Sequence, residues 1–412
     1  MGIFKRLILI LLIQILLVIV YKQFITVEFS YTGFFWDFNS EKLIESIFMI
    51  TFLFFAIEYR KKTVSYTILM ILLILMLVPF FTLFSLKNET RLYTYMAFIS
   101  FFFTVLITKL PLIRLFQFKV HVNKIFTALF LCTGFIMLSL LFLNGFPTLK
   151  ALNLFNVYEV RGSVKYGHKI MEYLVSWQAK VFNLFFIGYA IYTKRKSLFT
   201  VGIVSQIIIF LFTGHKSYLF APILLIFIFF ALQRKKLIMY LNYGLITILV
   251  LTLILYLNFG DISLGTILVR RVLFIPAQNY YYYYDYFHAH GFSFLSHSIF
   301  GLFLENKYPI PIPNLIGDYY YNNSSMWVNT GYLADAYMNF GFLGMILFSI
   351  LLGLILLFLD SLSLKLDALV IYSVTLINLY NLVNGALLTT LLTGGLGVGI
   401  LLLLFMANRK VQ

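Results

Sequence analysis

The sequence predicts an all-helical, multi-pass membrane protein, and three of its features lead to this fold class. Of its 412 residues, 62% are apolar or aromatic, and only 11% are charged. Soluble domains have about 45–50% apolar and about 25% charged residues, so this chain has too little polar surface to enclose a water-soluble core. Its apolar residues also gather in runs of about 17–25, the length that a membrane-spanning helix needs. A cytosolic globular enzyme and a disordered chain are both excluded.

Twelve apolar runs are long enough to be spans, and we expect them to form a single integral membrane domain over residues 1–412. The first run follows a basic start and lacks a small-residue cleavage site, so we interpret it as a span and not as a signal peptide. The twelve runs are 7–25, 43–59, 64–84, 92–108, 125–143, 177–193, 198–213, 217–233, 237–257, 338–359, 368–386 and 390–407.

Basic residues in the short connections predict how the spans are oriented. If the N-terminus is cytoplasmic, alternation of the spans puts 18 of the 31 Lys and Arg residues into short cytoplasmic segments, including the clusters 60–62, 194–196 and 234–236. Cytoplasmic loops of membrane proteins are enriched in Lys and Arg, so we predict that both termini are cytoplasmic. The same rule accounts for the net charge of +16 without a nucleic-acid partner.

Two predicted external segments, 144–176 and 258–337, are much longer than turns, and loops of this length are usually functional or disordered. The second holds tyrosine at every position from 280 to 284, then Asp285, and later Trp327. Such a density of aromatic residues is typical of a membrane interface or of a surface on which sugars stack, and both interpretations stay open. We expect residues 308–314 (YPIPIPN) to be extended, because proline fixes φ and removes a donor.

The predicted spans are almost free of ionisable residues, which inside a membrane are the first functional candidates. Polar residues such as Gln14, Gln206 and Asn378 are predicted to hold helices together. A transporter with a relay of buried carboxylates is therefore disfavoured. A flippase for lipid-linked oligosaccharides would place cations along a cavity within the spans, which the sequence does not indicate.

Candidate functional residues gather instead in the predicted external segments. The turn between the seventh and eighth spans reads TGHKS at 213–217, so Lys216 either meets an anionic headgroup such as a diphosphate or snorkels beside a turn glycine. Arg161 either binds an anion or belongs to a solvated loop. Arg270 and Arg271 lie in the apolar context GTILVRRVLFIPA, and because guanidinium groups bind phosphate in bidentate geometry we favour a functional role for them.

Residues 329–344 (NTGYLADAYMNFGFLG) lead into the tenth span from outside and contain the candidate base Asp335. In the first helical turn a carboxylate lies near the positive end of the helix dipole. Asp335 therefore either accepts a proton from a hydroxyl nucleophile or stabilises the helix N-terminus. Three histidines, at 288, 290 and 297, lack an accompanying carboxylate or Cys cluster, so no metal site is predicted.

These features resemble the bacterial oligosaccharide repeat-unit polymerases, the Wzy-type polymerases of O-antigen and capsule, which are related to O-antigen ligases. The resemblance lies in the span number, the TG-x-basic-S turn, the arginines of a large external segment, and the NFG-x-x-G pattern at 339–344. It implies a GT-C-type glycosyltransferase at the outer face of the cytoplasmic (inner) membrane. It also implies that a glycan is transferred from undecaprenyl diphosphate to a sugar hydroxyl of the next lipid-linked repeat unit, by an inverting-type attack and without metal or other cofactor.

The resemblance assigns roles to individual residues and implies partners. It implies that Arg161, Lys216, Arg270 and Arg271 bind the diphosphate and that Asp335 is catalytic. Further substrate contacts are predicted for His168, His215, Tyr284, His288, Trp327 and Asn329. The implied partners are undecaprenyl-diphosphate-linked oligosaccharides, membrane lipids and a chain-length regulator protein, in lipopolysaccharide or capsule biosynthesis. The alternatives are a flippase for lipid-linked oligosaccharides, an O-antigen ligase-like transferase, and an acyltransferase that uses His288 or His290.

Overall fold

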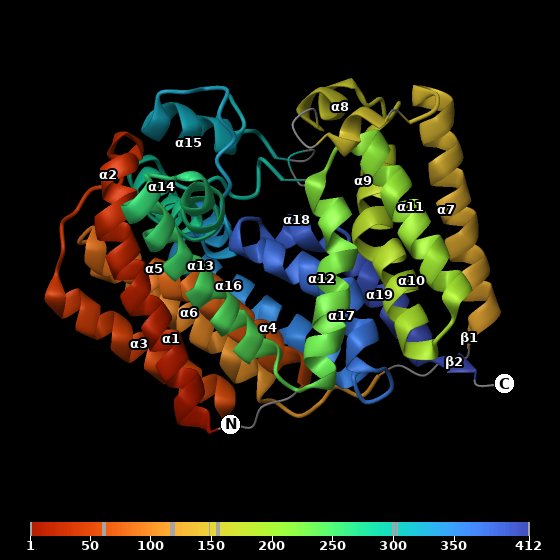
Figure 1. Ribbon diagram of the computed structural model, residues 1–412, viewed down its shortest axis with the longest axis horizontal. Helices are drawn as coiled ribbons and strands as arrows, with labels where there is room; N and C mark the ends of the chain where they lie inside the picture. Colours follow the sequence, from red (N-terminus) through yellow and green to blue (C-terminus); the bar gives the residue numbers. More distant parts are fainter. Residues whose placement is uncertain are drawn as a thin grey trace. The chain divides into compact units, whose positions relative to one another are not determined.

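A computed structural model of the chain describes residues 2–59, 63–115, 120–147, 149–153, 157–298, 301 and 304–410. The regular structure of this part is helical, apart from one parallel pair of two-residue strands, β1 (Val120–His121) and β2 (Arg409–Lys410) (Figure 1). The predicted class, a helical membrane protein, is therefore confirmed. The basic cluster 60–62 and Lys119, which the topology prediction uses, lie outside the described residues.

Nine helical segments among the described residues are long and apolar enough to cross a membrane. They are Ile3–Glu28, Val64–Leu86, Arg91–Thr108, Val122–Asn144, Lys169–Thr193, Lys196–Thr213, Lys216–Gln233, Leu237–Phe259 and Tyr332–Leu362. The other three predicted spans also coincide with helices. These are α3 (Ser40–Glu58), whose first two turns carry Glu41, Lys42 and Glu45, and the shorter apolar stretches Ala368–Val383 and Leu396–Ala407. Twelve spans remain a prediction.

The described chain folds into two compact units, each assembled from segments that are distant in sequence. Unit 1 consists of Met1–Pro111, Ile238–Leu357 and Asn381–Leu387, and unit 2 consists of Leu112–Leu237, Phe358–Tyr380 and Leu388–Gln412.

Unit 1 is built around a helix that is apolar on every side. This helix, α5 (Val78–Leu86), is buried along its whole length and packs against α1, α3 and α14. A helix without a polar face is stable only inside the protein or the membrane. The remaining elements of unit 1 are α1 (Ile3–Val20), η1 (Tyr21–Ile25), α2 (Thr26–Glu28), η2 (Ser30–Thr32), α3, α4 (Thr63–Leu72), η3 (Leu73–Leu77), α6 (Arg91–Thr108), α13 (Leu237–Phe259), η6 (Gly265–Phe274), α14 (Ile275–His290), α15 (Ile312–Tyr321), most of α16 (Tyr332–Leu362) and η8 (Asn381–Val383).

Unit 2 packs its helices around α10 (Asn183–Thr193), which contacts α11 (Lys196–Thr213) and α17 (Ala368–Tyr380). Gly188 and Gly202 allow these close approaches, since a Cβ on either would collide with the neighbouring helix. The other elements of unit 2 are α7 (Val122–Asn144), η4 (Leu149–Leu152), α8 (Val157–Ser163), α9 (Lys169–Trp177), η5 (Gln178–Phe182), α12 (Lys216–Gln233), α18 (Leu387–Leu391), α19 (Leu396–Ala407) and the two strands.

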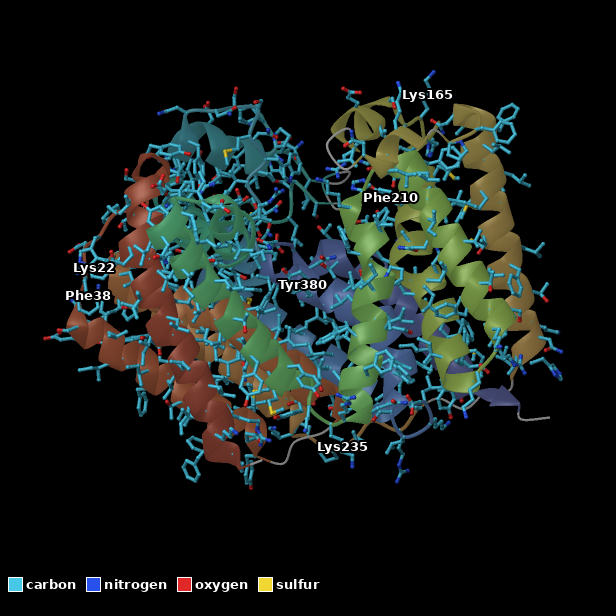
Figure 2. All side chains as sticks on the ribbon, viewed as in Figure 1. Lys22, Phe38, Lys165, Phe210, Lys235 and Tyr380 are labelled. Carbon is cyan, nitrogen blue, oxygen red and sulfur yellow. The ribbon has the colours of Figure 1, made fainter. Side chains whose placement is uncertain are left out.

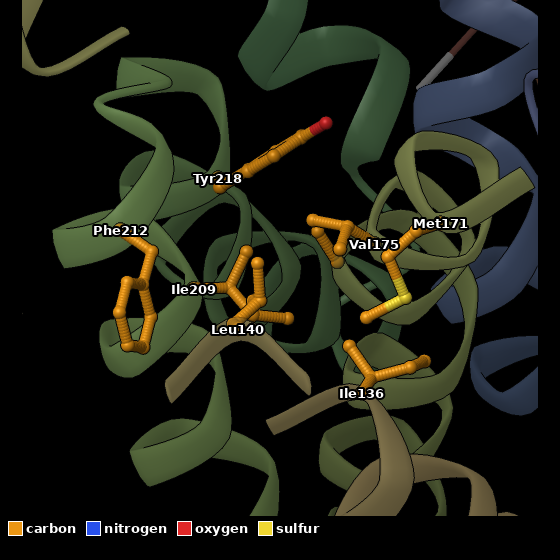
Figure 3. Packing of buried hydrophobic residues seen from close by; sticks show 8 residues of the cluster. Ile136, Leu140, Met171, Val175, Ile209, Phe212 and Tyr218 are labelled. Carbon is orange, nitrogen blue, oxygen red and sulfur yellow. The ribbon is translucent and has the colours of Figure 1, made fainter. Parts of the chain in front are cut away.

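A buried apolar cluster holds one end of unit 2 together, and it joins four helices (Figure 3). Its members on α7, α9, α11 and α12 are Ile136, Leu140, Met171, Val175, Ile209, Phe212 and Tyr218. The cluster includes residues on both sides of the turn between α11 and α12.

Buried amides connect helices within each unit, as predicted for the glutamines. Gln14 on α1 donates to the Ser46 hydroxyl on α3 at 2.7 Å. In unit 2, Asn183 donates to Gln206 at 2.8 Å, and Gln206 donates to the Tyr218 carbonyl at 2.8 Å. The prediction that such residues hold helices together is confirmed for Gln14 and Gln206. For Asn378 it is wrong among the described residues: its amide donates to the Val374 carbonyl of its own helix at 3.2 Å, and its Oδ1 has no hydrogen-bond partner.

The two long external segments are largely helical where the structure describes them. Residues 144–176 contain α8 and most of α9, and residues 258–337 contain η6, α14 and α15. Positions 148, 154–156, 299–300 and 302–303 of these segments lie outside the described residues. The expectation that 308–314 is extended is wrong for its second half, because α15 begins at Ile312 with Pro313 in its first turn, where proline is tolerated.

Candidate functional site

In unit 2, the turn between α11 and α12 packs against α8 and brings three predicted residues together. Gly214 ends α11 with φ +61°, and its carbonyl accepts a hydrogen bond from Arg161 Nη2 at 3.3 Å. A Cβ on Gly214 would lie 2.5 Å from the Val157 carbonyl oxygen, so glycine is needed both for the backbone angle and for the approach of α8. His215 and the partly buried Lys216 follow directly and begin α12.

The electrostatics of this turn favour negative charge. Burial, and after it the nearby cations Arg161 and Lys180, together lower the pKa of His215 to about 4. His215 is therefore neutral at physiological pH. The two cations close enough to act on His215 create a region of positive potential, where a bound anion is stabilised.

Lys180 is a cation that the sequence analysis passed over. It lies in the π-helical turn η5, within the span Lys169–Thr193, and it is the one charged residue in the predicted run 177–193. That isolation was the signal that could have identified it. His168, also in unit 2, is exposed and caps α9, because its Nδ1 accepts a hydrogen bond from the Ile170 amide at 3.2 Å.

The ends of unit 2 carry different cations. Lys165 lies at one end of the unit and Lys235 at the other (Figure 2). Lys165 belongs to the predicted external segment 144–176, and Lys235 belongs to the basic cluster 234–236 that the sequence assigns to the cytoplasm.

In unit 1 the tyrosine run of α14 is buried, and it forms neither an exposed stacking surface nor a belt at the unit's surface. Tyr281 stacks on Phe80 with ring centroids 4.7 Å apart, and Tyr284 stacks on Tyr93 at 4.6 Å. Tyr282 stacks on Tyr320 of α15 at 4.0 Å. These aromatic contacts attach α14 to α5, α6 and α15.

Asp285, which follows the tyrosine run, is exposed, and its carboxylate makes no hydrogen bond or ion pair with any other residue that the structure describes. Burial and the negative charge of Glu89 raise the pKa of Asp285 and Lys87 opposes them, which leaves the pKa at about 6. The carboxylate thus reaches solvent, while the surrounding protein displaces much of the water that would hydrate its charge.

The connection between α5 and α6 supplies the charges next to Asp285. Lys87 Nζ forms an ion pair with Glu89 at 3.1 Å, and it also lies 5.3 Å from the centre of the Tyr282 ring. Lys42 on α3 donates to the carbonyls of Asn88 and Glu89 at 2.9 and 2.6 Å. The connection is therefore rigidly attached to α3 and α14. The sequence alone could not identify it, since these residues resemble any polar turn.

The adjacent arginines of η6 have different surroundings. The Arg270 guanidinium lies 4.3 Å from the centre of the Phe29 ring, and Nη2 lies 3.4 Å from the Thr32 hydroxyl. Its Nε is buried without a hydrogen-bond partner among the described residues. Arg271 is exposed. One arginine is thus held in place by aromatic packing while its neighbour is directed to the surface.

Asp335 is buried at 5% exposure in the first turn of α16, where Asn339 Nδ2 donates to its carboxylate at 3.3 Å. At that exposure it offers little surface to an attacking hydroxyl. Five residues further, α16 breaks at Phe340 and Gly341, whose φ is +61°, and a Cβ on Gly341 would lie 2.7 Å from the Phe292 ring. Gly341 therefore permits a break in the helix.

The other predicted substrate contacts of unit 1 divide between buried and exposed positions. Tyr284 is buried, and its ring stacks on that of His288 at 5.3 Å. His288 is exposed, and its Nδ1 lies 3.3 Å from the Tyr337 hydroxyl. Trp327 is 63% exposed, and Asn329 is exposed with its carbonyl accepting from Asn279 at 2.9 Å. Tyr284 and His288 thus lie beside Asp285 on one helix.

The fold and these sites define a multi-pass helical membrane protein with a cationic turn in one unit and a tyrosine-flanked carboxylate in the other. No group of three His, Cys, Asp or Glu side chains that could hold a metal ion occurs among the described residues. Comparison with protein-family models, with curated proteins and with solved structures gives no match.

Proposed function

We propose that the chain is a membrane glycosyltransferase that polymerises oligosaccharide repeat units carried on undecaprenyl diphosphate, at the outer face of the bacterial cytoplasmic membrane. The observation that supports this proposal most is the positive potential at the α11–α12 turn, where Arg161 and Lys180 act on His215. A diphosphate leaving group is the kind of anion that such a turn would stabilise.

The chemistry requires little beyond the charges already described. The sugar–diphosphate bond of the donor is activated, so the enzyme has to stabilise negative charge on the departing phosphate. Arg161 and Lys216 are suited to this role, with Arg270 and Arg271 as the candidates in unit 1. The enzyme also needs a base for the attacking sugar hydroxyl.

The proposal includes the number of spans, their orientation and the fold type. We propose twelve spans, cytoplasmic termini and a GT-C-type arrangement. The positions of α3, α17 and α19 at three of the predicted spans support the number. Lys165 and Lys235 at opposite ends of unit 2 support the alternation of the spans, because the sequence assigns these residues to opposite sides of the membrane (Figure 2).

Reconstitution tests the proposal. Purified protein and a lipid-linked repeat unit, incubated with a chelator and without nucleotides, should yield a ladder of longer glycans. Arg161→Ala should reduce the rate of ladder formation about 100-fold, the loss typical for a group that stabilises developing negative charge. Lys165→Ala is the matched control: this exposed cation lies in the same unit and bonds to Asn144 through its backbone alone, so its loss should leave the ladder unchanged.

Lys180 supports one alternative, a flippase for lipid-linked oligosaccharides, since it places a cation within a span. A flippase would move the substrate between leaflets of a vesicle without lengthening it, and that result would replace our proposal. Release of lipid diphosphate without a ladder would instead indicate a ligase-like transferase that uses another acceptor.

A further inference from the structure

Asp285 differs from the other candidate carboxylate of unit 1 in its access to solvent. It is exposed near the C-terminal end of α14, whereas Asp335 is buried at 5% exposure and bonded to Asn339. No hydrogen bond or ion pair occupies Asp285 within the described chain. A proton acceptor has to reach the proton that it removes, so access favours Asp285.

A second observation at the same place is the hydroxyl of Tyr93. This side chain is fully buried, its oxygen has no hydrogen-bond partner among the described residues, and it lies within electrostatic reach of Asp285. Its ring stacks on Tyr284, the residue before Asp285. Buried hydroxyls normally have a partner, so an unpaired one beside an unpaired carboxylate indicates a place for a polar ligand.

Charged and titratable side chains surround Asp285 from several elements. Those that face it or its neighbours are Lys42 on α3, Lys87 and Glu89 between α5 and α6, Tyr93 on α6, Tyr281, Tyr284 and His288 on α14, Tyr320 on α15, and Tyr337 on α16. Tyrosines form the largest group among them, and most of these tyrosines are buried.

We propose that Asp285 is the general base of the transfer reaction and that Glu89, which Lys87 and Lys42 hold in place on the connection between α5 and α6, is a positioning residue for it. The Asp285 carboxylate accepts the proton of the acceptor sugar's hydroxyl as that oxygen bonds to the anomeric carbon of the donor. The bond from this carbon to the diphosphate oxygen breaks, and its electron pair leaves with the lipid diphosphate. The inference rests on the proposed function and names Asp285, in place of Asp335, as the base.

The neighbours of Asp285 bring the pKa of its carboxyl close to neutral pH. Burial and Glu89 raise its pKa to about 6, and Lys87 limits the rise. A base with a pKa slightly below the working pH is mostly ionised and still binds a proton well, which is the useful compromise for general-base catalysis. The rate should therefore increase with pH and level off above about 6.

The test compares the same substitution at both carboxylates. Asp285→Asn should slow ladder formation by about 100-fold or more, the usual contribution of a general base, while Asp335→Asn should retain most of the activity. Glu89→Gln removes a negative neighbour, so the acidic limb of the pH–rate profile should move to lower pH. A residue that only supports the fold would change the rate without moving that limb.

A measurement without turnover completes the test. In protein labelled with ¹³C-aspartate, the carboxyl signal missing from Asp285→Asn should titrate near pH 6, and at lower pH in Glu89→Gln. If Asp285→Asn forms ladders as fast as the wild-type protein, the inference is overturned but the proposed function is not. The same holds if Glu89→Gln does not move the Asp285 signal. Absence of any wild-type ladder overturns the proposed function and the inference with it.

Discussion

Asn183 is the centre of a buried hydrogen-bond network in unit 2, and its replacement by leucine should destabilise that unit. Its amide nitrogen donates to Gln206 at 2.8 Å. Its amide oxygen accepts from Gln178 and from the Ser205 hydroxyl, each at 2.7 Å. The side chain is fully buried, and leucine has a similar size, so Asn183→Leu removes three hydrogen bonds with little change in packing.

The magnitude follows from the number of bonds. A side-chain hydrogen bond between membrane helices contributes about 0.6 kcal/mol on average and about 1.7 kcal/mol at most. Asn183→Leu should therefore lower the free energy of unfolding by about 2 kcal/mol, and by no more than about 5 kcal/mol. In Asn183→Leu, Gln178 keeps its bond to Thr133, whereas Gln206 Oε1 loses its hydrogen-bond partner. We therefore expect the loss of unfolding free energy to exceed about 2 kcal/mol.

Trp177 provides the assay, because it lies in unit 2 next to Gln178 and donates to the Thr393 carbonyl at 3.0 Å. With the other two tryptophans replaced by phenylalanine, its fluorescence should report unfolding of unit 2 in mixed detergent micelles. Thr200→Val is the matched control in unit 2: it loses one local bond at an exposed position, so its effect should stay within about 0.5 kcal/mol. Equal stability of the Asn183→Leu and Thr200→Val proteins would refute the reasoning.

Three further predictions concern the turn, the helix break and the carboxylate. Gly214→Ala should lower the thermal unfolding midpoint and reduce phosphate binding, because the new Cβ would lie 2.5 Å from the Val157 oxygen at a φ of +61°; an unchanged midpoint and affinity would contradict this. Asn339→Leu should make residues 293–298 sensitive to protease, since Asn339 accepts from the Ser293 hydroxyl and the Leu295 amide at 2.7 and 2.8 Å; unchanged digestion would argue against that role. The pKa of Asp285 in the folded protein is raised to about 6, so the contribution of this carboxyl to stability is present at low pH and is lost as the pH rises through 6. Asp285→Asn should therefore remove that part of the pH dependence of the unfolding free energy. Curves of unfolding free energy against pH that run parallel for the two proteins would contradict the assignment.

The helical membrane fold could be predicted because membrane insertion depends on local composition. Each predicted span coincides with a helix, since a run of about 20 apolar residues has to satisfy its backbone hydrogen bonds internally wherever it lies. The roles of Gln14 and Gln206 could be predicted for a related reason: an amide inside an apolar run needs a partner on another helix.

The local sequence did not determine the structure of the proline-rich segment 308–314. Proline excludes a helix interior but tolerates the first turn, so residues 308–314 permit both an extended chain and a helix start. In the structure, the helix α15 starts at Ile312 and packs on α14. Similarly, nothing local distinguishes Arg270, which packs on Phe29, from the exposed Arg271.

The amino-acid sequence by itself determined that this chain is a helical membrane protein, and it singled out the turn at 213–217 as a candidate site with a cation. The tertiary structure alone decided which carboxylate is accessible: Asp335 is buried behind Asn339, whereas Asp285 is exposed beside Glu89 and Lys87. The physical reason is that hydrophobicity belongs to each segment, while solvent access and basicity depend on neighbours that come from distant parts of the chain.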